Sequence, residues 1–312
     1  MPELEELEIF RTILDSLLTG VYLVDRERKI RFWNGAAESI TGYHRHEVVG
    51  HFSRENILVG CDDLGCALCG AACPLTRVIH EGKPSEAQVF LRHKAGQRVP
   101  VRLRAFPIRN RHGSIVCTAV SFEESRLTSE MDFHQNNLAA HGCLDVLTGT
   151  PNHAFTQSHL RENLAFFDEY HLPFGILCIE VERLPELKAT HGRESVDVML
   201  HVVAQTMKHT LRPDGVLGRW GENQFLAIVT HCNDAELERL GQSLQKMASS
   251  SGIQWWDDML TVKVAVGRTM VQAGDSLDTL LERVYRSLEA SLPRSAAAAA
   301  AASGASPETS QR

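Results

Sequence analysis

Residues 216–230 read VLGRWGENQFLAIVT, and this stretch decides the predicted fold of the second half of the chain. Two apolar runs, 216–220 and 225–230, flank the polar segment GENQ, which is typical of two antiparallel strands joined by a tight turn. Outward from this hairpin, the pattern alternates between helix and strand. Helices are expected at 153–170, 195–211, 234–248 and 276–292, and further strands at 174–181 and 260–266. Such alternation predicts an α/β domain, with a sheet flanked by helices.

The first half of the chain has a different pattern. Residues 3–18 carry apolar side chains at three- and four-residue spacing, which predicts a lead-in helix. Two strands around a charged turn at 25–29 follow, then short helical pieces, and then three strands within 85–94, 98–110 and 114–124. Strands, small helices and an antiparallel sheet predict an α+β domain.

Length and charge limit the possible functions. The chain has 312 residues, with 32 Lys+Arg against 39 Asp+Glu and a formal charge of -7. A length of about 100–200 residues per domain predicts two domains. The mild acidity argues against a nucleic-acid partner and against a membrane-surface partner. Because MPELEELEIF lacks the features of a signal peptide and no run of ~18 apolar residues occurs, we expect a cytoplasmic protein.

The first half of the chain resembles a PAS domain. The stretch GVYLVDRERKIRFWNGAAESITGYHRHEVVGH at 20–51 is similar to the opening of that domain, and KAGQRVPVRLRAFPIRNRHGSIVCTAVSFEE at 94–124 is similar to its three closing strands. PAS domains bind haem, flavin, small metabolites, metals or no ligand. The resemblance therefore implies a sensor without implying its ligand.

The second half resembles the GGDEF, or diguanylate cyclase, domain. Its opening motif D-x-L-T-G-x-x-N is present at 145–152, and its signature loop R-[YW]-G-G-[DE]-E-F corresponds to RWGENQF at 219–225. The resemblance implies a nucleotidyl-cyclase-like sheet flanked by helices. It also implies a reaction in which Mg²⁺ assists the joining of two GTP molecules into cyclic di-GMP.

The positions that carry this chemistry in the family are altered. Joining two GTP molecules requires divalent cations held by carboxylates. Of three metal-binding positions, only Glu180 keeps a carboxylate, whereas Asn223 and Gln224 are neutral amides, which bind Mg²⁺ less well. Glu222 replaces a glycine of the turn, where we expect backbone strain and a negative charge facing phosphates. We expect an inactive cyclase; an active diguanylate cyclase that uses Glu180 for Mg²⁺ is the alternative.

The nucleotide-binding positions of the family are partly retained. Its guanine-binding Asn falls on Lys188, its guanine-binding Asp falls on Asp197, and Gly221 and Asn152 match the motifs. The inhibitory-site motif R-x-x-D leaves Arg212 as a remnant. Each retained residue also has a structural interpretation, because Asn152 can cap a helix and Asp197 can be a surface charge.

Four of the eight cysteines lie close together in the first domain, in the pattern C-x4-C-x2-C-x3-C-P. They are Cys61, Cys66, Cys69 and Cys73. Four thiolates can hold an iron–sulfur cluster or Zn²⁺. The alternatives are redox-active thiols and buried packing residues.

The predicted organisation has five parts. These are an N-terminal helix at 1–19, a PAS domain at 20–124, a linker helix at 125–143, a degenerate GGDEF domain at 144–293 and a disordered Ala-rich tail at 294–312. We expect a homodimer in which a change at the cysteines shifts the PAS strands, and the linker helix changes the pairing of the GGDEF domains. The expected output is binding of GTP, of cyclic di-GMP or of a signalling partner; a domain that serves only for dimerisation is a further alternative.

Overall fold

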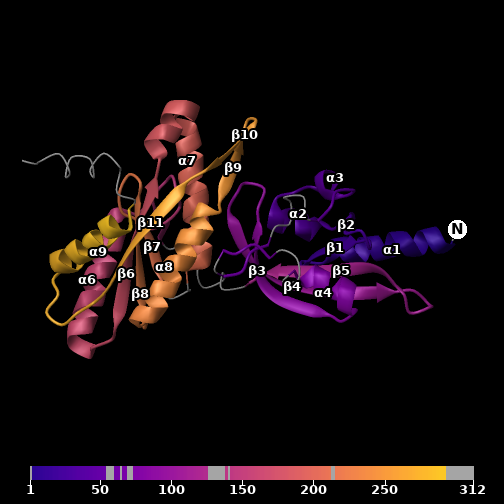
Figure 1. Cartoon of the computed structure of the whole chain (residues 1–312), viewed down its shortest axis with the longest axis horizontal. Coiled ribbons are helices and arrows are strands. Elements are labelled where there is room, and N and C mark those ends of the chain that lie inside the picture. Colours follow the sequence, from indigo (N-terminus) through magenta and orange to yellow (C-terminus); the bar gives the residue numbers. More distant parts are fainter. Residues whose placement is uncertain are drawn as a thin grey trace, which may run out of the picture.

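The structure is a computed structural model that describes residues 2–53, 60–63, 65–68, 73–125, 138–139, 141–211 and 215–292. Two domains follow one another along the long axis, and α1 (Pro2–Ser16) lies at one end (Figure 1). The predicted tail, most of the predicted linker helix and Arg212 lie outside the described residues. Within the described ranges, no helix is long and apolar enough to cross a membrane.

The N-terminal domain is built on a five-stranded antiparallel sheet with the strand order β2-β1-β5-β4-β3. Its strands are β1 (Gly20–Val24), β2 (Ile30–Trp33), β3 (Ser85–Arg92), β4 (Arg98–Arg109) and β5 (Ile115–Glu124). All five lie where the sequence pattern predicts them. One face buries the rings of Tyr22, Trp33 and Phe122, whose centroids are 5.5–6.0 Å apart. Buried aromatic side chains of this size dominate the energetics of a small core.

Among the described residues, three short helices pack on this domain: α2 (Gly35–Thr41), α3 (Arg45–Val48) and α4 (Pro74–Glu81). The ends of α4 match the sequence signals, because Pro74 opens the helix and Gly82 closes it with a left-handed φ of 66°. Asn34 caps α2 and donates its amide to the carbonyls of Leu14 and Thr19, at 2.8 and 3.0 Å. These bonds fasten the end of α1 to the sheet.

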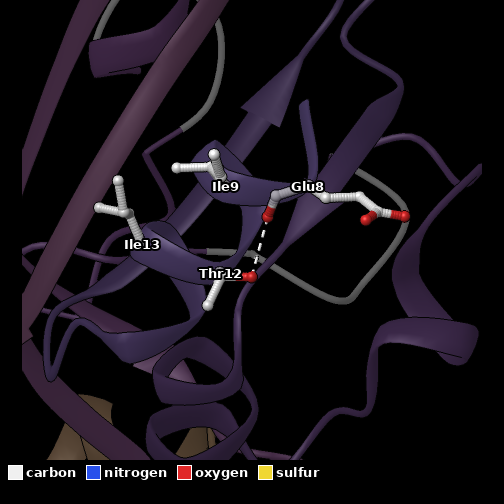
Figure 2. Close-up of a pocket in the computed structure, with 4 residues that line it drawn as sticks. All are labelled: Glu8, Ile9, Thr12 and Ile13. Carbon is white, nitrogen blue, oxygen red and sulfur yellow. Dashed lines mark hydrogen bonds between the residues drawn. The ribbon is translucent and has the colours of Figure 1, made fainter. Parts of the chain in front are cut away.

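In the apolar stripe of α1, the side chains of Phe10, Ile13 and, just after the helix, Leu17 are exposed to solvent. Figure 2 shows Glu8, Ile9, Thr12 and Ile13 around a shallow pocket on this helix, with Ile9 57% and Ile13 51% exposed. The Thr12 hydroxyl donates to the Glu8 carbonyl at 2.8 Å, within the same helix. The Thr12 hydroxyl therefore forms its hydrogen bond within α1.

The C-terminal domain has a four-stranded antiparallel sheet with the strand order β11-β6-β8-β7, and a separate hairpin of β9 and β10. The strands are β6 (Phe174–Glu182), β7 (Val216–Arg219), β8 (Gln224–Thr230), β9 (Gly252–Trp255), β10 (Asp258–Thr261) and β11 (Lys263–Met270). The helices are α6 (His153–Tyr170), α7 (Leu184–Thr210), α8 (Asp234–Ser249) and α9 (Leu277–Ser291). The expected sheet with flanking helices is confirmed.

Several boundaries differ from the sequence prediction, and strand β9 was not predicted. The single strand expected at 260–266 is divided at Val262, because its first part pairs with β9 and its second part pairs with β6. Helix α7 begins at Leu184, well before the expected 195, and bends at Gly192, where φ is 83°. A proline in the first turn and a glycine at the bend mask the helical periodicity of this segment.

Strand β6 is buried on both faces. Leu177 and Ile179 belong to the core formed with α7 and α8, whereas Ile176 and Cys178 belong to the core formed with α6 and α9. A strand covered on both faces requires a continuous apolar run. The run ends at Glu180, so this carboxylate is held at the end of a rigid central strand.

Candidate functional site

Strands β6 and β8 bring the predicted catalytic positions together. They pair antiparallel, and Glu180 lies opposite Gln224. The Gln224 amide donates from Nε2 to Glu180 Oε2 at 2.8 Å. Next to it, Asn223 Nδ2 donates to the Val181 carbonyl at 3.2 Å, and Val181 N donates to the Asn223 carbonyl at 2.9 Å. Three of the predicted positions therefore lie side by side where β6 pairs with the start of β8.

This network does not fit a Mg²⁺ ion. Mg²⁺ requires oxygen ligands at about 2.0–2.1 Å in an octahedral arrangement. Glu180 can only accept hydrogen bonds when ionised, so the amide must present its NH₂ group to it. One oxygen of the Glu180 carboxylate is therefore engaged by an N–H group, and a cation at that oxygen has to displace the Gln224 amide. Within the described residues, no group of three or more His, Cys, Asp or Glu is placed to hold a metal ion.

The backbone strain expected at Glu222 is absent, so that prediction is wrong. Neither Gly221 nor Glu222 has a positive φ. The turn closes through the Gln224 carbonyl, which accepts from Trp220 N at 2.8 Å and from Gly221 N at 3.0 Å. Arg219 supports it from the side, donating from Nε to the Gly221 carbonyl at 2.6 Å and from Nη2 to the Glu222 carbonyl. This turn does not require glycine, and Glu222 is exposed.

Arg219 is the cation of the site. It is half-buried, with its guanidinium 5.2 Å from the centre of the Phe225 ring. Burial lowers the pKa of Arg219, and the nearby carboxylates of Asp145, Asp197 and Glu222 act in the opposite direction. Its Nη1 atom is buried without a hydrogen-bond partner in the described part of the chain. The site therefore retains one guanidinium donor among acidic side chains.

Residues that hold the hairpin in place were not identified from the sequence. Trp220 Nε1 donates to the Tyr285 hydroxyl on α9 at 2.5 Å. The Trp220 carbonyl lies 2.9 Å from His153 Nδ1, and the two rings are 4.2 Å apart. The aromatic residue of the signature loop, Trp220, could have indicated such contacts. Its partners His153 and Tyr285 lie in distant parts of the sequence, so the motif does not identify them.

The retained opening motif has a structural role. Asn152 caps α6, accepting from Phe155 N at 3.0 Å, and it donates to the Gly142 carbonyl at 3.0 Å. Asp145 Oδ1 accepts from the backbone N and the hydroxyl of Thr148, at 2.9 and 2.7 Å. These bonds use both side chains without a nucleotide.

The two predicted guanine-binding positions lie on α7, on opposite sides of its bend at Gly192. Lys188 is exposed. Asp197 is partly exposed and pairs with Arg193, with Oδ2 3.7 Å from Nε. This pair fits the surface-charge interpretation of Asp197, although its carboxylate also acts on Arg219.

Cys61 contacts the other domain. It is 1% exposed, and its Sγ lies 3.7 Å from the Phe90 carbonyl and 3.6 Å from Met247 Sδ on α8. Burial raises the pKa of the Cys61 thiol. Two residues further on, the Asp63 carbonyl accepts from the Ser243 hydroxyl, also on α8. Cys61 and Asp63 of the N-terminal domain therefore contact helix α8 of the C-terminal domain.

The other cysteines of the cluster have different surroundings. Cys73 accepts from Arg28 Nη2 at 3.3 Å, and Cys66 is exposed. Cys69 lies outside the described residues. The iron–sulfur or zinc site stays a prediction from the sequence.

The turn between β3 and β4 extends the contact between the domains. Arg98 N donates to Thr206 Oγ1 at 3.1 Å, and the Arg98 carbonyl lies 2.8 Å from His209 Nδ1, both on α7. Arg92 Nη2 donates to the Gly252 carbonyl at 3.2 Å. No sequence motif indicated this contact, because it joins segments that are far apart in the chain.

Comparison with known families agrees with this architecture. The family model for the PAS fold matches residues 8–120, and the model described as "Diguanylate cyclase, GGDEF domain" matches residues 143–294. The chain is a PAS–GGDEF protein. Its structure is similar to that of the diguanylate cyclase SiaD from Pseudomonas aeruginosa in complex with its activator SiaC, at a TM-score of 0.48 and 22% identity, over 52% of this chain and 63% of that chain.

Two curated relatives of the PAS–GGDEF protein are named for opposite reactions, one as a cyclase and one as a phosphodiesterase. It is 23% identical over 271 residues to the probable diguanylate cyclase DgcE of Escherichia coli (strain K12), which is 86% of this chain and 24% of DgcE. It is 20% identical over 231 residues to the cyclic di-GMP phosphodiesterase PdeR of the same strain, which is 72% of this chain and 33% of PdeR. The chain thus spans about a quarter to a third of these relatives, and similarity does not decide its activity.

Proposed function

We propose that this PAS–GGDEF protein is a signalling protein whose GGDEF domain has lost cyclase activity and acts by binding GTP or a protein partner. The observation that carries the proposal is the hydrogen bond from the Gln224 amide to Glu180. A catalytic cation needs oxygen atoms from both positions. A hydrogen bond to a charged group stabilises the folded state by about 1.5–3 kcal/mol. A cation that binds between the two side chains has to break this bond and lose that stabilisation.

The domain contact supports a route for the signal. The segment at Cys61 rests on α8, and the turn before Arg98 rests on α7. Both helices pack on β6, the strand that ends at Glu180. A change in the PAS domain can thus reach the signature hairpin within one chain. A homodimer paired through the linker helix completes the proposed arrangement.

For the input, the surroundings of the cysteines favour thiol chemistry over a metal cluster. Cys61 contacts Met247 of the other domain, whereas Cys73 contacts Arg28 of its own domain. Anaerobic purification with metal analysis and a visible absorption spectrum tests this preference. A coloured protein with stoichiometric iron, or a colourless one with stoichiometric zinc, contradicts it.

The loss of catalysis is tested by restoring the family residues. The triple variant Glu222→Gly, Asn223→Asp, Gln224→Glu places carboxylates beside Glu180, and the parent and the variant are incubated with GTP and Mg²⁺ at equal concentration. We expect cyclic di-GMP from the variant and none from the parent. Equal product from both proteins contradicts the proposal and favours the active cyclase. Equilibrium dialysis of the parent with GTP measures binding separately.

A further inference from the structure

Residues 93–98, the turn between β3 and β4 with the first residue of β4, form what we call the docking turn. The Arg98 amide of this turn donates to Thr206 Oγ1 on α7 at 3.1 Å. The Arg98 carbonyl lies 2.8 Å from Nδ1 of His209, also on α7. Contacts between domains of one chain are commonly polar and permit relative motion of the domains. We therefore expect this contact to open more easily than either core.

His93 closes the docking turn in its neutral form. Its Nδ1 accepts a hydrogen bond from Ala95 N at 3.0 Å, so this nitrogen carries a lone pair and no proton. The opposite edge of the ring lies against the backbone of Gly42, where a Cβ would be 2.7 Å from both Cε1 and Nε2. Protonation of Nδ1 places a second N–H group in front of the Ala95 N–H group. It therefore breaks this hydrogen bond of the turn.

The surroundings of His209 also disfavour a charged ring. Burial lowers the pKa of His209; the hydrogen bond to the Arg98 carbonyl acts in the opposite direction, and the neighbouring Lys208 acts in the same direction as burial. Burial likewise lowers the pKa of His93, and His209 adds to this effect from across the contact. The two rings therefore lie close enough for a proton on one to disfavour a proton on the other.

The charges near the two imidazoles do not compensate an added proton. Within the described residues, no carboxylate acts on either ring. The nearest described carboxylate of the PAS side, that of Glu47, is engaged by Lys94 Nζ at 2.6 Å. Strand β9, which packs beside the turn, contains no titratable residue. The titratable groups around the contact are Arg92, Lys94 and Arg98 on the PAS sheet, Tyr43 and Glu47 beside them, Cys61, and Lys208 on α7.

We propose that the contact between the docking turn and α7 is a pH-sensitive latch, which opens when His93 and His209 take up protons. Once the contact is open, water surrounds both rings, and each binds a proton near about pH 6.5. The latch is therefore closed above that value. Below it, each ring favours opening by up to about tenfold per pH unit. The inference rests on the route proposed above for the signal, to which it adds protons as an input, and it does not depend on whether the GGDEF domain is catalytic.

The amide of Arg98 reports on the latch directly, because its acceptor Thr206 belongs to the other domain. Its hydrogen exchange is measured in the full chain without GTP and Mg²⁺, and is corrected for the intrinsic exchange rate at each pH. We expect the protection of this amide to fall about fivefold or more between about pH 6.5 and 5.5. The amides of β6 are expected to keep their protection, because both domains stay folded.

The double variant His93→Asn, His209→Asn removes both protonation sites and retains the hydrogen-bonding groups. An Asn side chain can accept from Ala95 N through Oδ1 and can donate to the Arg98 carbonyl through Nδ2. The double variant is expected to keep the protection of the Arg98 amide over the same pH range. His112→Asn is the matched control, because His112 is exposed on the turn between β4 and β5. In this control, the protection is expected to fall as in the parent.

A second measurement does not require the histidine variants to retain the contact. Gly96→Ala places a Cβ 2.3 Å from the Gly252 carbonyl oxygen, so it opens the latch at every pH. Because opening and proton binding are linked, the rings of His93 and His209 are expected to titrate at a higher pH in this variant than in the parent. The titration is followed by NMR of the ring protons.

Four results would overturn the proposal. The first is protection of the Arg98 amide that does not change with pH in the parent. The second is an equal fall of protection in the parent and the double variant, and the third is equal titration of the two rings in the parent and in Gly96→Ala. The fourth is a parallel loss of protection in β6, because acid then unfolds a domain. None of them bears on cyclic di-GMP formation, so failure of this inference is distinguishable from failure of the proposed function.

Discussion

Replacing Gln224 by Glu converts the hydrogen bond at the end of β6 into a repulsion between two carboxylates. The amide and Glu180 Oε2 are 2.8 Å apart, and both side chains are half-buried. The variant loses a bond to a charged group, worth about 1.5–3 kcal/mol when fully protected from solvent. Two like charges about 4 Å apart add about 1–4 kcal/mol at effective dielectric constants between 80 and 20.

Partial exposure and rotation of the new side chain reduce both contributions. We expect Gln224→Glu to lower the free energy of unfolding of the GGDEF domain by about 2–3 kcal/mol. For a domain of this size, such a loss corresponds to a fall of roughly 5–10 °C in the unfolding temperature. The two carboxylates can then share a cation. With a Kd of about 1 mM, about 10 mM Mg²⁺ returns about 1.4 kcal/mol to the variant.

The assay is differential scanning calorimetry in EDTA and in Mg²⁺, with sodium chloride at matched ionic strength. Gln242→Glu is the matched control, because Gln242 also faces a carboxylate, that of Glu238 at 3.5 Å, but on the exposed surface of α8. It is expected to change the unfolding temperature little and without a Mg²⁺ effect. The reasoning is refuted if the parent is stabilised by Mg²⁺ as much as Gln224→Glu, because Gln224 would then not prevent cation binding.

Three further predictions concern the domain contact and the opening motif. A Cβ at Gly96, where φ is 105°, would lie 2.3 Å from the carbonyl oxygen of Gly252, so Gly96→Ala should increase amide hydrogen exchange in β9. Gly50 is the control, because it has a φ of 96° but open space around it, and Gly50→Ala should leave that exchange unchanged. Burial lowers the pKa of His209 from 6.5. The folded state therefore loses stability as the pH falls below about 6.5, whereas above that value its stability does not depend on this side chain's protonation. His209→Gln should make the free energy of unfolding less dependent on pH in that range. Asn152→Ala should cost about 1 kcal/mol in urea unfolding with and without GTP, and a larger loss in GTP would contradict its structural role.

Local patterns explain what could be predicted from the sequence. The five strands of the PAS sheet alternate or run apolar over short stretches, and the Pro74 and Gly82 signals locate α4 at both ends. The motifs at 145–152 and 219–225 locate the residues of the candidate site along the chain in the same way. These features depend on neighbouring residues, which a single sequence displays.

The remaining features depend on partners that are distant in the chain. The conformation of the turn at Glu222 is closed by hydrogen bonds from Arg219, so the glycine argument alone predicted strain that is absent. Cys61 was grouped with its sequence neighbours, yet its sulfur contacts Met247 across the domain boundary. His93 and His209 carry no motif, and only the packing of the two domains shows that they lie at one contact.

The central claim of the proposal is that the GGDEF domain does not form cyclic di-GMP. The most direct measurement is product formation by the intact parent chain at high protein concentration with GTP and either Mg²⁺ or Mn²⁺, followed by chromatography over many hours. We predict no product above that of the Glu180→Ala variant. Cyclic di-GMP formed by the parent and abolished in Glu180→Ala would contradict the claim.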